Sequence, residues 1–260
     1  MDYTIAAVDR ALRLLEVVAE NQSIGLSELA RMTGSSKTLA FRMASTLEQR
    51  GYLIKDPVER TYSLGYKPLY LTEWMQQSSP LVRIANPFLD DLSARTRENV
   101  SVFVRDGLKS NCIAIRQSPQ PIRLYAELGR QAPLHVGGGP KLLLAHAPKE
   151  VQEEVLASGL EAFTPTTIVD PKKLKTLLAR IRRQGYNVSH GDLDPGAFSV
   201  AAPIRDHGGR VIAALTIAGP QSRLNGDLEA LYIRMLLEAT RDISVKLGWK
   251  DDTEPALADR

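Results

Sequence analysis

The sequence has 260 residues, of which 43% are hydrophobic and 24% charged, with a formal net charge of +3. This composition excludes wholesale disorder, and the small net charge does not by itself indicate a nucleic-acid partner. No apolar run reaches the roughly 18–20 residues of a membrane span, and charged Asp9 and Arg10 interrupt any signal-like segment. We therefore expect a cytoplasmic protein without a membrane partner. The single cysteine, Cys112, excludes an intrachain disulfide, and with only four histidines no metal site or other cofactor is expected.

The first predicted unit, residues 1–65, combines short helices with a strand hairpin. Apolar residues at intervals of three and four indicate helical faces, and turn-rich segments separate the strands. The predicted elements, in chain order, are helices over 8–19, over 27–34 and from a cap at Ser35 or Ser36 to Arg50, then strands over 52–55 and 61–64. This order predicts a winged helix-turn-helix.

The third predicted helix carries a polar face that suits the major groove of DNA. At about 100° per residue, its hydroxyls, cations and one aromatic ring gather opposite the apolar residues, with no acid before Glu48. Such groups can contact phosphates, base edges and the thymine methyl. The alternative is a three-helix packing module with a solvated face, in which Phe41 packs under the wing. The predicted DNA-binding residues are Ser35, Ser36, Lys37, Thr38, Phe41, Arg42 and Ser45 on and before this helix, and Lys55 and Arg60 at the wing tip.

Residues 66–79 are predicted to form a linker, with a helix from Tyr66 to Ser78. Its apolar residues, among them Leu71, Trp74 and Met75, are too isolated to be buried within the small unit. We therefore expect this helix to pack against a second copy of the chain, in a homodimer or a homotetramer.

Residues 80–250 alternate between strand and helix patterns. Two strand hairpins are predicted, one turning at Asp106 and Gly107 and the other at Gly208 and Gly209. Helical periodicity recurs over 174–181 and 228–239. We expect an α+β domain with a largely antiparallel sheet and helices at its faces. The polar tail, residues 251–260, is predicted to be flexible.

A glycine run, Gly137 to Gly139, is the first candidate ligand site. It is followed by Pro140 and a helix, so free backbone N–H groups could approach an anion at the helix N-terminus. It is not a P-loop, because no Ser or Thr follows Lys141. The alternative is a tight strand-to-helix turn. His135, just before the run, could face a pocket or simply pack.

Asp192 and Asp194 invite an acid–base interpretation. However, they precede a Pro-Gly turn, where aspartates commonly hydrogen-bond the backbone. The sequence also has no nucleophile elbow, HExxH or CxxC motif, so an enzyme is not expected. Cys112 lies in an apolar strand and is interpreted as a buried small hydrophobe.

Several segments, in this order and spacing, resemble the isocitrate lyase regulator (IclR) family of bacterial transcription factors. They are residues 7–20, 26–53, 61–65, 132–145, 182–188 and 195–224. The resemblance implies a winged helix-turn-helix that binds double-stranded operator DNA, a dimerising linker helix and a GAF-like domain that binds a small-molecule effector.

The resemblance also implies effector-binding positions. Backbone contacts correspond to Gly138 and Gly139, and His135 lies beside them. Family members that bind small carboxylates use an acidic residue, a cysteine and two serines, and the aligned positions here are Ser189, Ser199, Thr216 and Ala218. This wall is therefore less polar, and the effector is expected to be a carboxylate or aromatic metabolite of unassigned identity.

The expected function is that of a repressor-type regulator of a catabolic operon. The alternatives are an enzyme that converts a small molecule, and a DNA-binding oligomer without an effector.

Overall fold

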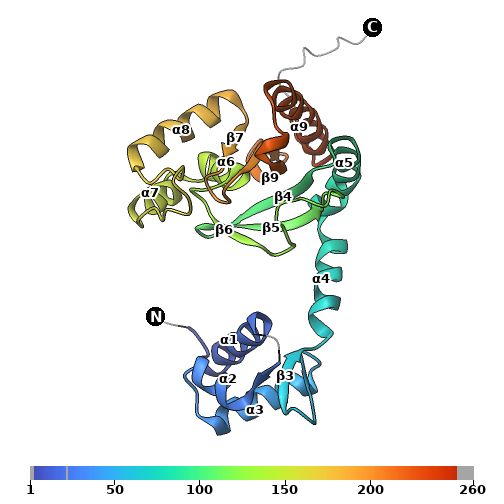
Figure 1. Cartoon of the computed structure of the whole chain (residues 1–260), viewed down its shortest axis with the longest axis vertical. Helices are drawn as coiled ribbons and strands as arrows, with labels where there is room; N and C mark the ends of the chain where they lie inside the picture. Colours follow the sequence, from blue (N-terminus) through green and yellow to red (C-terminus); the bar gives the residue numbers. More distant parts are fainter. Residues whose placement is uncertain (1–2, 22, 251–260) are drawn as a thin grey trace. The chain divides into compact units, whose positions relative to one another are not determined.

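The computed structural model describes residues 3–21 and 23–250, which fall into two compact units that divide between Ser78 and Ser79 (Figure 1). The first unit has one hydrophobic core, and the second has two, one on each face of its sheet. The tail that was predicted to be flexible, residues 251–260, lies outside the described residues. None of the described helices combines the length and apolar character that a membrane crossing requires.

The first unit is a winged helix-turn-helix, as the sequence predicts. Its sheet is antiparallel in the order β1-β3-β2, and the helices bury Leu14, Leu29 and Ala40 against Leu53 and Tyr62 of the wing strands. The two-residue strand β1 was not predicted, because it is too short to show a periodicity. The elements are α1 (Ala6–Glu20), β1 (Ile24–Gly25), α2 (Leu26–Met32), α3 (Lys37–Gln49), β2 (Leu53–Lys55), β3 (Thr61–Leu64) and α4 (Lys67–Ser78).

The turn between α2 and α3 is fixed by local hydrogen bonds. Gly34 has a φ of +61°, a left-handed conformation that glycine adopts without a steric penalty. The N–H of Ser35 donates to the carbonyl of Ala30 at 2.9 Å. The Ser36 hydroxyl accepts from the N–H of Leu39 at 3.2 Å, so Ser36, and not Ser35, is the cap of α3.

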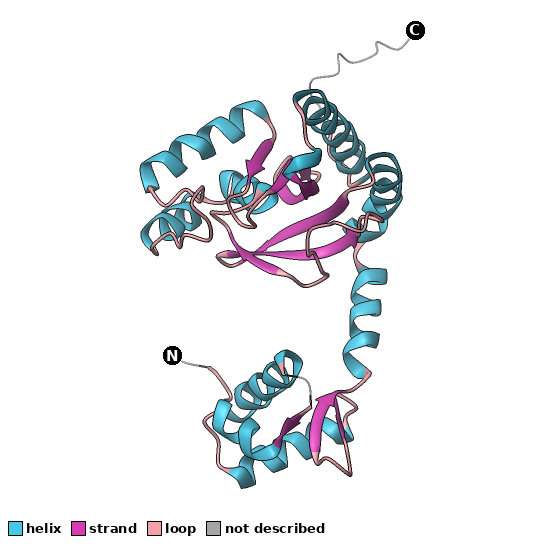
Figure 2. Cartoon of the chain, in the orientation of Figure 1, coloured by secondary structure: helices cyan, strands magenta, loops and turns pink. Residues whose placement is uncertain are grey.

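The second unit is an antiparallel sheet in the order β6-β5-β4-β9-β8-β7, covered by helices on both faces (Figure 2). The α+β class is therefore confirmed. The elements are α5 (Pro80–Thr96), β4 (Asn99–Asp106), β5 (Lys109–Arg116), β6 (Gln131–Pro133), α6 (Gly138–His146), α7 (Lys149–Ala157), α8 (Pro171–Gln184), β7 (Asn187–His190), β8 (Ala197–Arg205), β9 (Val211–Pro220), the 3₁₀ turn η1 (Gln221–Arg223) and α9 (Gly226–Lys246).

Alternation along the strands assigns side chains to the two faces. On β8, Val200, Ala202 and Ile204 join the core formed with α5 and α9. Ala201 belongs to the other core, with α6 and α8. Because successive side chains of a strand point to opposite faces, Ser199 shares the α6 face with Ala201.

Both predicted hairpins form, but the first turn is displaced by one residue. Asp106 pairs with Lys109, so the turn consists of Gly107 and Leu108 instead of Asp106 and Gly107. The second turn contains Gly208 and Gly209, the latter with a φ of +78°.

Helix α5 was not predicted. It buries Val82, Ala85, Leu89 and Leu92 on one face, a helical spacing that the interior Pro87 obscures in the sequence. Pro80 begins this helix, at a position where a missing N–H does no harm.

Candidate functional site

Helix α3 presents the predicted polar face. Lys37, Thr38, Phe41 and Arg42 are exposed and Ser45 is partly exposed. The opposite face buries Ala40, Met43 and Ala44 in the core. Hydroxyl, cationic and aromatic groups thus remain available on one side of the helix.

The wing approaches this face through Lys55. Its Nζ lies 5.9 Å from the ring centroid of Phe41 and 5.8 Å from that of Tyr62, within cation–π range. Phe41 is 46% exposed. This exposure excludes the alternative interpretation, in which Phe41 packs under the wing. The structure therefore brings a residue of α3 and a residue of the wing together.

The wing turn is held by Asp56. Its Oδ1 accepts from the N–H groups of Glu59 at 2.9 Å and Val58 at 2.7 Å. These backbone bonds lower the pKa of Asp56, because they favour the carboxylate. Arg60 follows in a left-handed conformation with a φ of +56° and is exposed at the wing.

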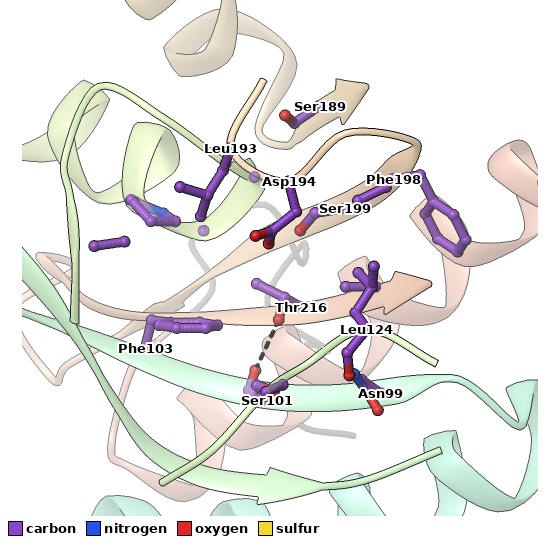
Figure 3. Close-up of a pocket in the computed structure, with 18 of the residues that line it drawn as sticks. Asn99, Ser101, Phe103, Leu124, Ser189, Leu193, Asp194, Phe198, Ser199 and Thr216 are labelled. Carbon is purple, nitrogen blue, oxygen red and sulfur yellow. Dashed lines mark hydrogen bonds between the residues drawn. The ribbon is translucent and has the colours of Figure 1, made fainter. Parts of the chain in front are cut away.

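In the second unit, a cavity of about 90 Å³ lies between the first turn of α6, strands β4, β8 and β9, and the loops that precede β6 and β8 (Figure 3). Because this volume is open to the centres of water-sized groups, the cavity has room for a small molecule. It is lined by six of the predicted effector residues, namely Gly138, Gly139, Ser189, Ser199, Thr216 and Ala218.

His135 is not among the lining residues, which corrects the expectation that it faces the pocket. It is buried, its Nε2 lies 2.9 Å from the carbonyl of Glu161, and its ring centroid is 6.1 Å from that of Phe163. Plain packing and one backbone hydrogen bond therefore account for it.

Strand register explains why the cavity exists. Ser199 pairs with Ala218, and Thr216 pairs with both Ala201 and Ser101. Small side chains at these adjoining positions leave space under α6 that larger side chains would fill. Apolar walls complete the site, among them Phe103, Leu124, Leu193 and Phe198.

The two glycines are required by packing of the helix on the sheet. A Cβ on Gly138 would come within 2.5 Å of the Ser199 hydroxyl, and one on Gly139 within 2.9 Å of the Thr216 methyl and 3.2 Å of the Phe103 ring. The alternative interpretation, a tight strand-to-helix turn, therefore explains in part why glycines occupy these positions. The glycines also leave polar groups free, since the described residues offer no hydrogen-bond partner to the N–H of Gly138 or Gly139.

Asp192 plays a different part from the one expected. Its carboxylate accepts from the N–H of Gly137 at 2.9 Å, from the Ser189 hydroxyl and from the Lys141 ammonium. The Lys141 and Asp192 side chains are only 4% and 6% exposed. The carboxylate thus joins α6 to a segment 55 residues further along the chain, which is not the local turn that the Pro-Gly sequence suggested.

Two hydroxyls of the site are therefore already engaged. Ser189 donates to Asp192, and Thr216 Oγ1 donates to the carbonyl of Ser101 at 3.3 Å. Ser199 Oγ makes no hydrogen bond within the described part of the chain and faces the cavity (Figure 3). The donors open to a ligand at this end are thus the Ser199 hydroxyl and the N–H groups of Gly138 and Gly139.

Sequence reasoning missed part of the lining, including Asn99, Ser101, Phe103, Leu124 and Arg130. Ser101 and Phe103 alternate with apolar residues in a predicted strand, a signal that could have placed them on one face. Nothing local indicates Arg130, because its contact with Asp194 joins residues 64 positions apart.

Cys112 is 2% exposed, and burial raises the pKa of its thiol to about 11. The thiol therefore stays protonated near neutral pH. This supports the interpretation of Cys112 as a buried hydrophobe.

Together the two units define a class of protein: a winged helix-turn-helix combined with a domain that encloses a small ligand-sized cavity, as in ligand-responsive transcription regulators. The IclR helix-turn-helix domain matches residues 7–57, and the bacterial transcriptional regulator IclR C-terminal domain matches residues 75–245. The chain belongs to the IclR family. It is a transcriptional regulator with a DNA-binding and an effector-binding domain.

Individual relatives agree with this assignment. The chain is 30% identical over 243 residues to the HTH-type transcriptional regulator KipR of Bacillus subtilis, covering 93% of this chain and 97% of KipR. It is 30% identical over 248 residues to the transcriptional repressor IclR of Escherichia coli, covering 94% and 90%. A crystal structure of an IclR homolog from Microbacterium hydrocarbonoxydans, complexed with 4-hydroxybenzoate, matches with a TM-score of 0.82 and 27% identity over 93% of this chain and 98% of that one. Because these relatives are named as regulators, the enzyme alternative is set aside.

Proposed function

We propose that the chain represses a catabolic operon in the cytoplasm by binding a near-palindromic operator, and that a small acid bound in the cavity changes its affinity for that DNA. The observation that carries the DNA part is the exposed set Lys37, Thr38, Phe41 and Arg42 on one face of α3. Ser35, Ser36, Ser45, Lys55 and Arg60 complete the proposed interface, where phosphate contacts supply affinity and base contacts supply specificity.

An acid is supported by the polar groups that the cavity leaves open. The N-terminus of α6 favours negative charge through its dipole, and the N–H groups of Gly138 and Gly139 and the Ser199 hydroxyl can donate to a carboxylate. Phe103 and Leu124 suit an apolar or aromatic body. The homolog complexed with 4-hydroxybenzoate supports the same class of ligand.

A homodimer, or a homotetramer built from dimers, is supported by α4. This helix buries no residue within its own chain, and Leu69 and Trp74 are 66% and 61% exposed. Packing against a second copy would remove this apolar surface from water. Two winged units in one dimer would read two half-sites.

The test is footprinting of the full chain on the intergenic DNA beside its own gene, repeated with a panel of small acids. We expect two protected half-sites and an acid that changes operator affinity about 5–150-fold, the usual range of allosteric coupling. Binding without sequence preference would contradict the proposal that the chain recognises an operator. Specific binding that no acid alters would favour the oligomer without an effector.

A further inference from the structure

The cavity contains an ion pair that no sequence motif indicated. Arg130, directly before β6, places Nη2 at 3.0 and 3.2 Å from the two carboxylate oxygens of Asp194, in the turn before β8. Both residues line the cavity, and their side chains are 28% and 39% exposed. Figure 3 shows the Asp194 carboxylate directed into the cavity beside Ser199.

Two other paired carboxylates of this unit, in contrast, are buried. Asp192 has the three donors described above. Glu98 is held by Arg223 through Nε at 2.6 Å and through Nη2 at 2.5 Å, with a side chain that is 4% exposed. Both carboxylates are almost wholly removed from solvent, whereas Asp194 is 39% exposed.

Asp194 and Arg130 both keep unused hydrogen-bonding capacity. Among the described residues, the Asp194 carboxylate accepts from Arg130 Nη2 alone, although a carboxylate offers about four acceptor positions. Arg130 Nη1 donates to the carbonyl of Tyr125 at 2.5 Å, and the guanidinium lies 5.7 Å from the Tyr125 ring centroid. Its Nε has no acceptor in the part of the chain that the structure describes. The Arg130–Asp194 pair is therefore held in place by Tyr125, while both side chains still have hydrogen-bonding groups without a partner among the described residues.

The chemistry of an open Arg–Asp pair selects a neutral group that both donates and accepts. A second carboxylate at this point would be repelled by Asp194, and an ammonium would be repelled by Arg130. A hydroxyl carries one donor and two acceptor lone pairs, so it can donate to Asp194 and accept from Arg130 at the same time.

We propose that Arg130 and Asp194 form a hydroxyl subsite, and that the effector is a hydroxy acid. This inference rests on the proposed function, in which the carboxylate of the effector lies at the N-terminus of α6. The hydroxyl is then bound by Arg130 and Asp194, and the carbon body between the two groups contacts the apolar wall that includes Phe103 and Leu124.

The experiment compares acids that differ by a single hydroxyl. The full chain is titrated calorimetrically with benzoate against 4-hydroxybenzoate, and with propanoate against 3-hydroxypropanoate. We expect the hydroxylated member of at least one pair to bind about tenfold more tightly, equivalent to about 1.4 kcal/mol. In Asp194→Ala and in Arg130→Gln, this preference should fall below about threefold.

Asp90→Ala is the matched control, because Asp90 forms an ion pair with Arg116 at 2.5 Å and does not line the cavity. It should keep the full preference, and thermal unfolding should show that all variants are folded. If acids bind without a hydroxyl preference, or if Asp194→Ala retains the preference, the hydroxyl subsite is overturned while the acid effector stands. If no acid of either kind binds, the proposed effector class is wrong and the subsite fails with it.

Discussion

Two neighbouring aspartates in one turn serve opposite purposes, and the difference lies in what surrounds each carboxylate. Asp192 is buried and accepts hydrogen bonds from three donors, whereas Asp194 is 39% exposed and bonded only to Arg130 within the described residues. The sequence shows both as turn residues before Pro195 and Gly196. Only the fold distinguishes them, because the donors to Asp192 come from α6 and β7.

Breaking the buried pair should destabilise the second unit strongly. Lys141→Met leaves the Asp192 carboxylate buried without its cation, and Asp192→Leu leaves the Lys141 ammonium uncompensated. Each change should cost about 3–5 kcal/mol of unfolding free energy, and the double variant should cost less than the sum of the two. Calorimetric unfolding of the parent and the three variants measures this, and additive effects would show that the two charges are not coupled.

His146, at the end of α6, should make stability depend on pH. Burial and the nearby Arg205 and Arg182 lower its pKa from 6.5 to about 4, so the folded state keeps it neutral while the unfolded state takes up a proton. Stability from this residue is therefore complete above about pH 6.5 and is lost as pH falls toward 4. Allowing for its partial exposure, we expect a loss of about 1–2 kcal/mol between pH 7 and pH 5. His146→Leu should remove this part of the pH dependence in denaturant unfolding, and an unchanged pH slope would contradict the assignment.

Among the secondary-structure elements, periodicity decides what the sequence can predict. The helices around Leu14 and Leu178 and both long hairpins show clear patterns, and all of them form. Helix α5 escapes prediction because Pro87 interrupts its pattern, and β6 and β7 are too short to show one. The glycine run is readable as a turn, but its reason, close packing on β8 and β9, requires contacts far apart in the chain.

Substitutions on helix α3 should distinguish side chains that contact bases from side chains that contact phosphates. Arg42→Ala should weaken operator binding by about 1–3 kcal/mol, with the loss concentrated on particular operator sequences, if the side chain reads a base. Lys37→Ala should weaken binding to all sequences and reduce the salt slope by about one, if its ammonium contacts a phosphate. Fluorescence anisotropy over a salt series with operator variants distinguishes these results. Parent-like binding by both variants would exclude α3 as the reading element.

A larger side chain in the first turn of α6 should destabilise the second unit as well as obstruct a ligand. Gly139→Val would bring a side chain into Thr216 and Phe103, so we expect it to lower the thermal midpoint of the second unit as well as the affinity for an acid. Thr216→Val keeps the shape and removes one hydroxyl that already donates to Ser101, so acid binding should weaken by at most about 0.5–1.5 kcal/mol. Calorimetric titration with 4-hydroxybenzoate beside thermal unfolding separates the two effects. Full affinity in both variants would place the acid elsewhere.

For the whole molecule, regulation requires that effector binding favour one arrangement of the assembled protein over another, since a ligand shifts an equilibrium only through differential affinity. Sequence alone predicts the two units and the helix that follows the wing in the chain. It does not predict the cavity ion pair, whose members are 64 positions apart in the chain, one before β6 and the other before β8. Assembly through α4 is the step that would join two DNA-binding units.

Trp74→Glu should separate the assembled chains. Trp74 is 61% exposed in one chain, with the Lys67 ammonium 5.8 Å from its ring, and a partner helix would bury it together with Leu69. A carboxylate at this point would have to be desolvated in the interface, so sedimentation should shift toward monomer. Operator affinity should fall in parallel, because each monomer then contacts a single half-site and loses the effective concentration that links the two. Gln76→Glu is the matched control, since it adds the same charge to α4 without removing an apolar side chain. A parent protein that is monomeric at micromolar concentration would refute dimerisation through this helix, and unchanged assembly of Trp74→Glu would place the interface elsewhere.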